Sequence, residues 1–284
     1  MSTLQIRRMT LPDVQDIAVE WAAAEGWNPG LGDAASFYAA DPDGFLAGWI
    51  NDQPIACISA VRYAPNFGFI GFYIVRPGYR GQGHGLALWK AAMQHLEGRI
   101  IGLDGVVEQQ DNYRRSGFAL AYNNIRFEGT TPLPISAETG ATVVPADQLP
   151  FESLLAYDRR YFPADRAAFL TAWLRQPESR ALAMVAGEKI QGYGVIRPSR
   201  EGYKIGPLFA ETPVFAHQLL TGLVQSIAPQ TRFYLDVPAV NPEALNLAHR
   251  YGMQPVFETA RMYAGNAPRI DVNGIFGVTT FELG

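Results

Sequence analysis

The sequence holds a single cysteine, Cys57, in 284 residues, so the chain cannot form an internal disulfide. This composition suits a reducing compartment. No apolar run approaches the roughly 18 residues of a membrane span, and the opening MSTLQIRRMT lacks the apolar stretch and cleavage site of a signal peptide. Dense Lys/Arg runs are also missing and the net charge is −4, which disfavours nucleic acid as a partner. We therefore expect a soluble, cytoplasmic protein that binds neither membrane nor nucleic acid.

What the chain has in quantity is apolar sequence, 48% of its residues, enough for the cores of two domains of ordinary size. Its two halves also resemble each other. The stretch FYLDVPAVNPEALNLAHRYGM in the second half parallels IIGLDGVVEQQDNYRRSGF in the first, and the alignment pairs Asp236 with Asp104 and Arg261 with Arg126. A repeat of this length indicates duplication of a whole domain.

A polar connector, GTTPLPISAETGA, separates the two halves. Each half reads as a strand, helices, a three-stranded meander, a helix, a strand, a short helix and a closing strand. The last segment, IFGVTTFELG, is expected to be a docking strand between domains. We predict a first domain at 1–130, a linker at 131–140 and a second domain at 141–284.

Glycines recur in IVRPGYRGQGHGLALWKAAM, which passes from an apolar strand pattern into an amphipathic helix pattern. A helix N-terminus presents unpaired N–H groups and the positive end of the helix dipole, which together favour a phosphate. Glycines let the backbone approach such a ligand closely. Two common phosphate patterns fail, because Gly83 is followed by His84 rather than lysine, and a dinucleotide fingerprint would need a glycine at Leu86.

The array RGQGHG at residues 80–85, directly after a strand and opening a helix, resembles the acyl-CoA pyrophosphate loop of the GCN5-related N-acetyltransferases. The order of elements over residues 4–129 matches that family, and Tyr113 precedes Gly117 by four residues, as the family's tyrosine does. The resemblance implies an α+β fold with a mixed central sheet, in two tandem copies as in the YitH-like branch. The second copy reads GPLFAETPVFAHQ at the corresponding place, with Glu211 near the helix start. We expect it to keep the fold and to lack the CoA loop.

The resemblance further implies acetyl-CoA as co-substrate and no metal. Backbone groups at the end of the strand would pair with the pantetheine arm, loop amides would face the pyrophosphate, and an arginine would add a charge-assisted contact. Tyr113 is expected to act as catalytic acid, giving its proton to the departing thiolate. The residues expected to bind the cofactor are Ile74, Val75, Arg80, Gly81, Gln82, Gly83, His84, Gly85 and Asn112.

The acceptor is expected over the loop EGWNPGLGDAASF, where Trp27 and Asn28 would contact the substrate. The general base stays open. Asp104 and Glu108, around the end of the next strand, are the nearest acids by topology, and Glu20 and Glu25 lie at the end of the first helix. Any of them could act through water, and deprotonation by bulk water is the alternative. Residues 156–170 of the second half, which combine aromatic and charged side chains, are candidates for closing the same pocket.

The sequence thus predicts an N-acetyltransferase that transfers an acetyl group to a primary amine of a small molecule or protein, by direct attack in a ternary complex. Two alternatives stay open. One is an acyl-CoA-binding sensor without turnover. The other is a Fem-type aminoacyltransferase, which is also built from paired domains of this fold but uses aminoacyl-tRNA, and which the intact RGQGHG loop and a pI near 5.6 disfavour. The identity of the amine and the choice between monomer and homodimer are not encoded in any recognisable pattern.

Overall fold

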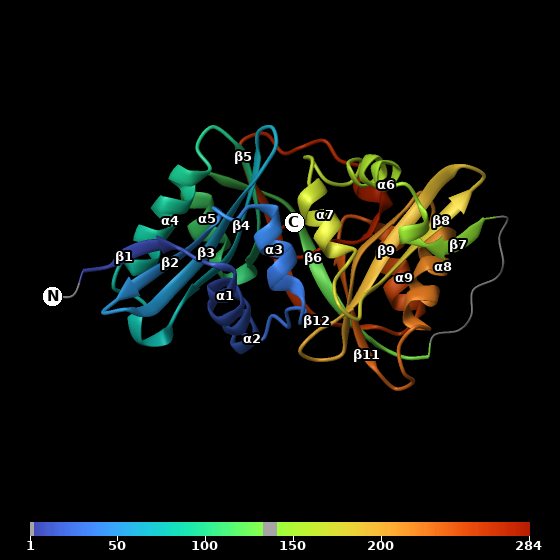
Figure 1. The fold of residues 1–284 in the computed structure, drawn as a ribbon, viewed down its shortest axis with the longest axis horizontal. Helices are drawn as coiled ribbons and strands as arrows, with labels where there is room; N and C mark the ends of the chain where they lie inside the picture. Colours follow the sequence, from blue (N-terminus) through green and yellow to red (C-terminus); the bar gives the residue numbers. More distant parts are fainter. Residues whose placement is uncertain (1–2, 133–140) are drawn as a thin grey trace.

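A computed structural model describes residues 3–132 and 141–284 and shows the two halves of the chain side by side (Figure 1). The first half, coloured blue to green, and the second half, coloured yellow to red, share one sheet of thirteen strands within the described residues. Both halves follow the expected order of elements, and the predicted α+β fold with a mixed sheet is confirmed. The predicted linker lies outside the described residues from position 133 to 140, and the domain boundaries stay a prediction.

The strands and helices have the following bounds. The strands are β1 (Gln5–Arg8), β2 (Phe45–Ile50), β3 (Gln53–Tyr63), β4 (Phe67–Val75), β5 (Ile100–Val106), β6 (Phe118–Thr130), β7 (Thr142–Pro145), β8 (Arg180–Ala186), β9 (Lys189–Pro198), β10 (Tyr203–Ala210), β11 (Arg232–Pro238), β12 (Gln254–Ala264) and β13 (Ile275–Gly277). The α-helices are α1 (Leu11–Asp13), α2 (Glu20–Ala24), α3 (Asp33–Ala40), α4 (His84–His95), α5 (Gln110–Arg115), α6 (Phe151–Asp158), α7 (Ala167–Trp173), α8 (Pro213–Val224) and α9 (Pro242–Arg250). A π-helical segment, η1 (Val14–Val19), joins α1 to α2, and short 3-10 turns are η2 (Pro77–Tyr79), η3 (Val107–Gln109), η4 (Ala146–Gln148) and η5 (Val272–Gly274).

In the first half, helices pack against both faces of the sheet. Because side chains alternate along a strand, Phe45 and Ala47 of β2 face a core shared with η1, α2 and α3. Leu46 faces the other core, which contains Leu88 and Trp89 of the amphipathic helix α4. The helix that runs from α1 to α2 begins after Thr10, which forms a capping box with Asp13.

The two halves exchange strands at the centre of the sheet, where the order is β4-β5-β12-β6-β11-β10. β12 runs antiparallel to both β5 and β6, so β5 and β6 are parallel to each other and are not neighbours. In the same way β6 runs antiparallel to both β11 and β12 and fills the space between them. Each half therefore has a gap in its sheet that a strand of the other half fills.

Two buried Asp–Arg pairs join the exchanged strands. Arg261 on β12 donates through Nε and Nη2 to the two carboxylate oxygens of Asp104 on β5, at 2.8 and 2.6 Å. Arg126 on β6 does the same to Asp236 on β11, at 2.6 and 2.8 Å. These are the four residues that the internal repeat aligns, and each pair takes one residue from each half. All four side chains are at most 7% exposed, so the pairs hold the two halves together in an environment with little solvent screening.

The end of the chain crosses to the first half. Only Ile275–Gly277 of the expected docking strand forms a strand, and it pairs with β10 of its own half. The residues that contact the first half are instead 279–284, which are buried. Tyr63 Oη donates to the carbonyl oxygen of Leu283 at 3.2 Å, and the carbonyl oxygen of Glu282 lies so close to Gly71 that an added Cβ would be 2.1 Å from it. The tail thus occupies the space that a side chain on β4 would otherwise fill.

Candidate functional site

The main cavity, of about 620 Å³, opens where β4 and β5 separate. The two strands pair in parallel only from Phe67 with Ile100 to Ile70 with Leu103. Beyond this point residues 70–75 and 103–106 line the cavity, together with the start of α4. Separated parallel strands leave backbone N–H and C=O groups available to a ligand that lies between them.

A β-bulge explains why β4 leaves its neighbour. On β3 one residue lies between Cys57 and Ser59, whereas on β4 two residues lie between their partners Ile74 and Gly71. Phe72, one of these two, has a positive φ of 49°. Cys57 is buried and its Sγ donates to the carbonyl oxygen of Phe72 at 3.2 Å. The thiol therefore supports the bulge.

The glycine loop predicted from RGQGHG lies between η2 and α4, beside this cavity. Gly81 and Gly83 have positive φ values of 75° and 84°, and an added Cβ on either would meet nothing within 4 Å. Gly83 caps α4 without a side-chain hydrogen bond. Gly85 is different, because an added Cβ would lie 2.7 Å from Tyr73 Oη. The loop thus leaves the first N–H groups of the helix unblocked and admits no side chain where it meets β4.

Arg80 ties this loop to the end of the first helix. Its Nε donates to the carbonyl oxygen of Val75 at 2.7 Å, and its Nη2 donates to Glu25 Oε1 at 2.6 Å. The Arg80 side chain is still half exposed, so the guanidinium lies at the mouth of the cavity with hydrogen-bond donors to spare.

The structure separates the predicted cofactor residues into those that line the cavity and those that do not. Gln82 is exposed and donates to the carbonyl oxygen of Gly78 at 2.9 Å. His84 begins α4 with its ring 6.3 Å from that of Tyr79. Asn112 lines an adjoining cavity of about 300 Å³. The predicted cofactor residues that line the main cavity are Ile74, Val75, Arg80, Gly81, Gly83 and Gly85.

Tyr113 lines both the main cavity and the adjoining one. Its ring packs 5.7 Å from Trp89 and 6.5 Å from Phe118. An added Cβ on Gly105 would lie 2.2 Å from Tyr113 Cε2, so the tyrosine takes this position only because β5 carries a glycine there. Burial raises the pKa of Tyr113 to about 12, which keeps its hydroxyl protonated at neutral pH.

The two acids expected near the acceptor have different surroundings. Asp104 lines the cavity, but its carboxylate is fully buried, bound by Arg261 and accepts a hydrogen bond from Asn124 at 2.8 Å. Burial raises the pKa of Asp104, and Arg261 opposes this shift. Glu108 is exposed in η3 and is not among the lining residues.

Of the acceptor loop, Glu25 and Trp27 line the main cavity. Asn28 is instead hydrogen-bonded to the backbone of Glu201 at 2.9 and 3.1 Å. Asn28 lines a separate cavity of about 230 Å³. Residues 156–170 also stay outside the main cavity. Phe162 in this segment packs against Tyr63 and Phe67, with ring centroids 4.9 and 5.6 Å away.

A narrow slot of about 30 Å³ adjoins the main cavity and shares five of its lining residues. It was not expected from the sequence. Its lining residues are Trp27, Gly71, Phe72, Asp104, Val106, Phe257, Thr259, Phe281 and Glu282. The small residues of FGFIGF and IIGLDGVV, placed inside strands, were the sequence signal that a backbone or ring approaches closely there. Nothing in the sequence indicated that residues 281 and 282 would be the partners.

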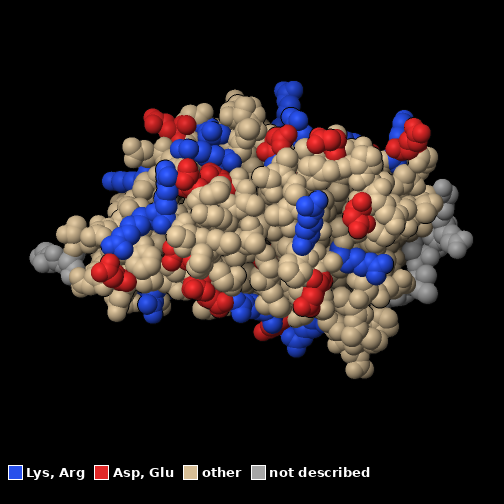
Figure 2. Space-filling model, viewed as in Figure 1, with Lys and Arg blue, Asp and Glu red and all other residues tan. Residues whose placement is uncertain are grey.

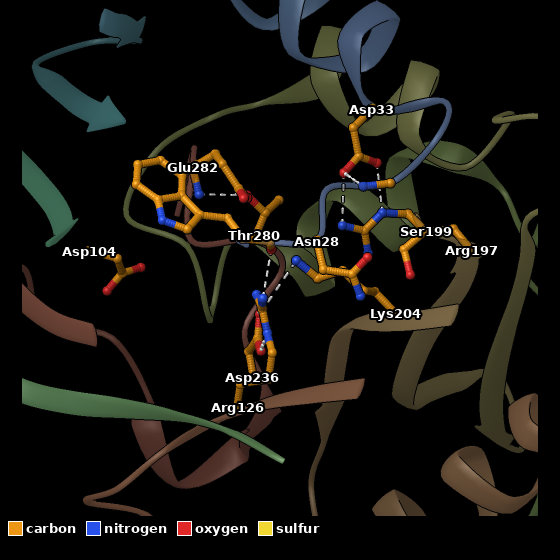
Figure 3. A network of polar contacts seen from close by, with 12 residues as sticks. Asn28, Asp33, Asp104, Arg126, Arg197, Ser199, Lys204, Asp236, Thr280 and Glu282 are labelled. Atoms are coloured by element: carbon orange, nitrogen blue, oxygen red, sulfur yellow. Dashed lines mark hydrogen bonds and ion pairs between the residues drawn. The ribbon is translucent and has the colours of Figure 1, made fainter. Parts of the chain in front are cut away.

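A network of buried charged side chains lies between the two halves, next to the loop that carries Trp27 (Figure 3). Besides its bond to Asp236, Arg126 donates through Nη1 to the carbonyl oxygen of Trp27 at 2.7 Å. Arg197 donates to both oxygens of Asp33, at 2.7 and 3.0 Å. Burial, followed by the charge of Arg126, lowers the pKa of the neighbouring Lys204 to about 8. The loop that carries Trp27 is thus fixed by Arg126 of the first half and Arg197 of the second.

The surface and composition of the described residues add three observations. Charged side chains of both signs are scattered over the face shown in Figure 2. Across residues 3–132 and 141–284, no group of three or more His, Cys, Asp or Glu residues is arranged to hold a metal ion. The same residues include no helix long and apolar enough to cross a membrane.

Comparisons with known proteins agree on one family. Residues 11–118 match the model of the acetyltransferase (GNAT) family, and residues 154–277 match that of an acetyltransferase (GNAT) domain. A holothin acyltransferase from Pseudoalteromonas sp. (strain SANK 73390) is 33% identical over 268 residues, which cover 94% of this chain and 90% of the relative.

Solved structures show the same fold over the whole chain. A putative acetyltransferase from Pyrococcus horikoshii is 25% identical with a TM-score of 0.83, covering 99% of this chain and 96% of that one. A tandem GNAT protein from the clavulanic acid biosynthesis pathway is 12% identical with a TM-score of 0.62, covering 93% and 100%. The two-domain arrangement thus recurs in a solved structure.

Proposed function

Since this chain belongs to the GCN5-related N-acetyltransferase family, whose members use acyl-CoA, we propose that it transfers an acetyl group from acetyl-CoA to a primary amine by direct attack in a ternary complex. One observation carries the proposal. The RGQGHG loop opens α4 beside a cavity at the separation of β4 and β5, and Tyr113 lines the same cavity.

The donor side fits an acyl-CoA. Loop amides from Gln82 to Gly85 would hold the pyrophosphate, because the helix start is uncapped and Gly81 and Gly83 leave open space around the backbone. Backbone groups of Ile74 and Val75 would pair with the pantetheine arm, and Arg80 would add positive charge at the mouth. Asn112 would contact the cofactor from α5.

The equivalent helix of the second half offers no such site. Thr212 caps α8 by accepting a hydrogen bond from Phe215 N, and Pro213 has no N–H group. Glu211 beside the helix start is ion-paired with Arg160. The second half is therefore expected not to bind CoA.

Tyr113 would act as the general acid. Thioester aminolysis releases a thiolate that must gain a proton, and a buried phenol that stays protonated at neutral pH can supply it. The primary test is calorimetric titration with acetyl-CoA, followed by thiol-release assays with holothin, polyamines, amino acids and peptides. Binding together with turnover of one acceptor supports the enzyme, whereas tight binding with no turnover on any acceptor favours the sensor.

Replacing Gly83 with alanine is expected to weaken acetyl-CoA binding about 5- to 30-fold. The φ of 84° at this position costs an L-residue about 1–2 kcal/mol, so the loop would leave the geometry that exposes its amides. Calorimetry measures the dissociation constant. Gly98→Ala is the matched control, because Gly98 follows α4 with a φ of 77° in open space and lies outside the loop. Equal effects of the two variants would remove the loop from the binding site.

Replacing Tyr113 with phenylalanine is expected to lower kcat about 10- to 1000-fold, the general range for loss of acid catalysis, with little change in acetyl-CoA affinity. The ring keeps its packing against Trp89 and Phe118, so only the hydroxyl is lost. Steady-state thiol release and calorimetry measure the two quantities. An unchanged kcat would leave Tyr113 with a packing role alone.

A further inference from the structure

The C-terminal tail brings a carboxylate into the site from the far end of the chain. Residues 279–283 are at most 6% exposed, and the carbonyl oxygen of Glu282 lies against Gly71 at the bulge of β4. Glu282 is one of the residues that line the slot adjoining the main cavity. A residue of the second half therefore faces the opening between β4 and β5.

The Glu282 carboxylate is held in one position. Its Oε2 accepts a hydrogen bond from Thr280 Oγ1 at 2.6 Å, and Thr280 Oγ1 in turn accepts from Glu282 N at 2.8 Å and Leu283 N at 3.3 Å. Within the described residues, Oε1 has no hydrogen-bond partner and the carboxylate has no ion pair closer than 4 Å. One oxygen of a fixed carboxylate is thus left for a ligand.

The other acids that line the two cavities are already engaged. Asp104 is bound by Arg261 and Asn124, and Glu25 is paired with Arg80. Both oxygens of Asp104 are thus engaged, whereas Glu25 is paired through Oε1 alone and lines the main cavity but not the slot. Of the two acids that line the slot, Asp104 and Glu282, it is Glu282 that has an oxygen left to receive a proton from a substrate.

The charges around Glu282 leave room for one more cation. Arg126 and Lys204 both interact electrostatically with it, but Arg126 is bound to Asp236, and Lys204 Nζ lies 3.9 Å from the same carboxylate. Asp104 on the slot wall is already paired with Arg261. An ammonium group in the slot would therefore pair with the Glu282 carboxylate itself.

The remaining slot wall is aromatic and apolar. Trp27 comes from the first half, and Phe257 and Phe281 come from the second. The slot has room for little more than the ammonium group, to which such walls offer cation–π attraction. The body of the acceptor would lie in the main cavity beside Trp27 and Phe72, which line both spaces and favour a compact apolar or aromatic group.

We propose that Glu282 binds the ammonium group of the acceptor in this slot and acts as the general base, the acceptor being a primary amine on a compact apolar or aromatic body. This assignment rests on the proposed N-acetyltransferase function. Oε1 takes one proton from the ammonium, and the lone pair of the neutral amine forms the C–N bond to the thioester carbonyl carbon. The C–S bond then breaks, the thiolate takes the proton of Tyr113, and Tyr113 recovers one from the amide nitrogen. The proton on Glu282 leaves to solvent.

The test compares wild type with Glu282→Gln, which keeps the size of the side chain and can still accept the bond from Thr280. Glu188→Gln, an exposed glutamate in the turn between β8 and β9, is the matched control. Acetyl-CoA is the donor, and the acceptors are phenethylamine, which is protonated at neutral pH, and hydroxylamine, which is not. Calorimetric binding of acetyl-CoA checks that each variant is folded.

We expect Glu282→Gln to lower kcat/KM for phenethylamine about 100-fold at neutral pH. The loss should shrink as the pH rises towards the pKa of the amine, and hydroxylamine should be affected less than about 3-fold. Glu282→Asp, which keeps the carboxylate on a shorter stem, should retain part of the activity. Equal losses with both nucleophiles at every pH, or no loss with either, would overturn the assignment while the proposed function stands. A wild type that binds acetyl-CoA and acetylates neither amine nor any acceptor of the wider panel would overturn the proposed function and this assignment together.

Discussion

Residues 1–132, expressed alone, are expected not to fold into an acetyl-CoA-binding domain, although they carry the whole RGQGHG loop and Tyr113. The reason is the sheet. β5 and β6 are parallel and are separated by β12, which belongs to the second half, so the fragment lacks the strand that joins its last strand to the rest. The open edge of β5, the two open edges of β6 and the missing tail over Gly71 favour aggregation instead.

Two measurements on the purified fragment test this prediction. Calorimetry gives its affinity for acetyl-CoA, and far-ultraviolet circular dichroism gives its content of secondary structure. The control keeps both parts and removes only the covalent connection. Co-expression of residues 1–132 with residues 133–284 is expected to give a complex that binds acetyl-CoA like the intact chain. A monomeric fragment that binds acetyl-CoA within a few-fold of the intact chain would show that the exchanged strand is dispensable.

Replacing Arg261 with methionine is expected to lower the free energy of unfolding by about 3–5 kcal/mol, the range for removing one partner of a buried ion pair. Asp104 would keep the hydrogen bond from Asn124 and lose its only cation within 4 Å among the described residues. The related change Arg126→Met should have an effect of the same size, because Arg126 holds Asp236 in the same way.

Denaturant unfolding followed by fluorescence and circular dichroism measures the loss. Arg7→Met is the control, since the pair of Arg7 with Asp52 is exposed and should contribute less than about 1 kcal/mol. Adding Asp104→Leu to Arg261→Met should recover part of the stability, because it removes the unpaired charge. A loss below about 1 kcal/mol for Arg261→Met would mean that the buried pair does not hold the halves together.

Sequence reasoning worked best where a few neighbouring residues decide the structure. Gly81 and Gly83 take the positive φ values that glycine tolerates, and the helix after them begins at His84. The order of strands and helices, set by local hydrophobic period, was equally readable. The predicted roles of the loop residues and of Tyr113 stay predictions that the variants above test.

The internal repeat was also visible in the sequence, but its spatial consequence was not. The alignment placed Asp104 beside Asp236 and Arg126 beside Arg261 as equivalents. It could not show that each aspartate pairs with the arginine of the opposite half, because strand neighbours in a sheet are chosen by packing between distant segments and not by local pattern.

The amino-acid sequence by itself therefore determined the family, the order of elements and the glycine loop, since each rests on residues that are close together in the sequence. Tertiary structure alone decided the exchange of β6 and β12, the separation of Asn28 from the cavity, and the arrival of Glu282 at the β4 bulge. These depend on contacts between segments far apart in the chain, where the free energy of burial is shared among many side chains and no short pattern records the partner.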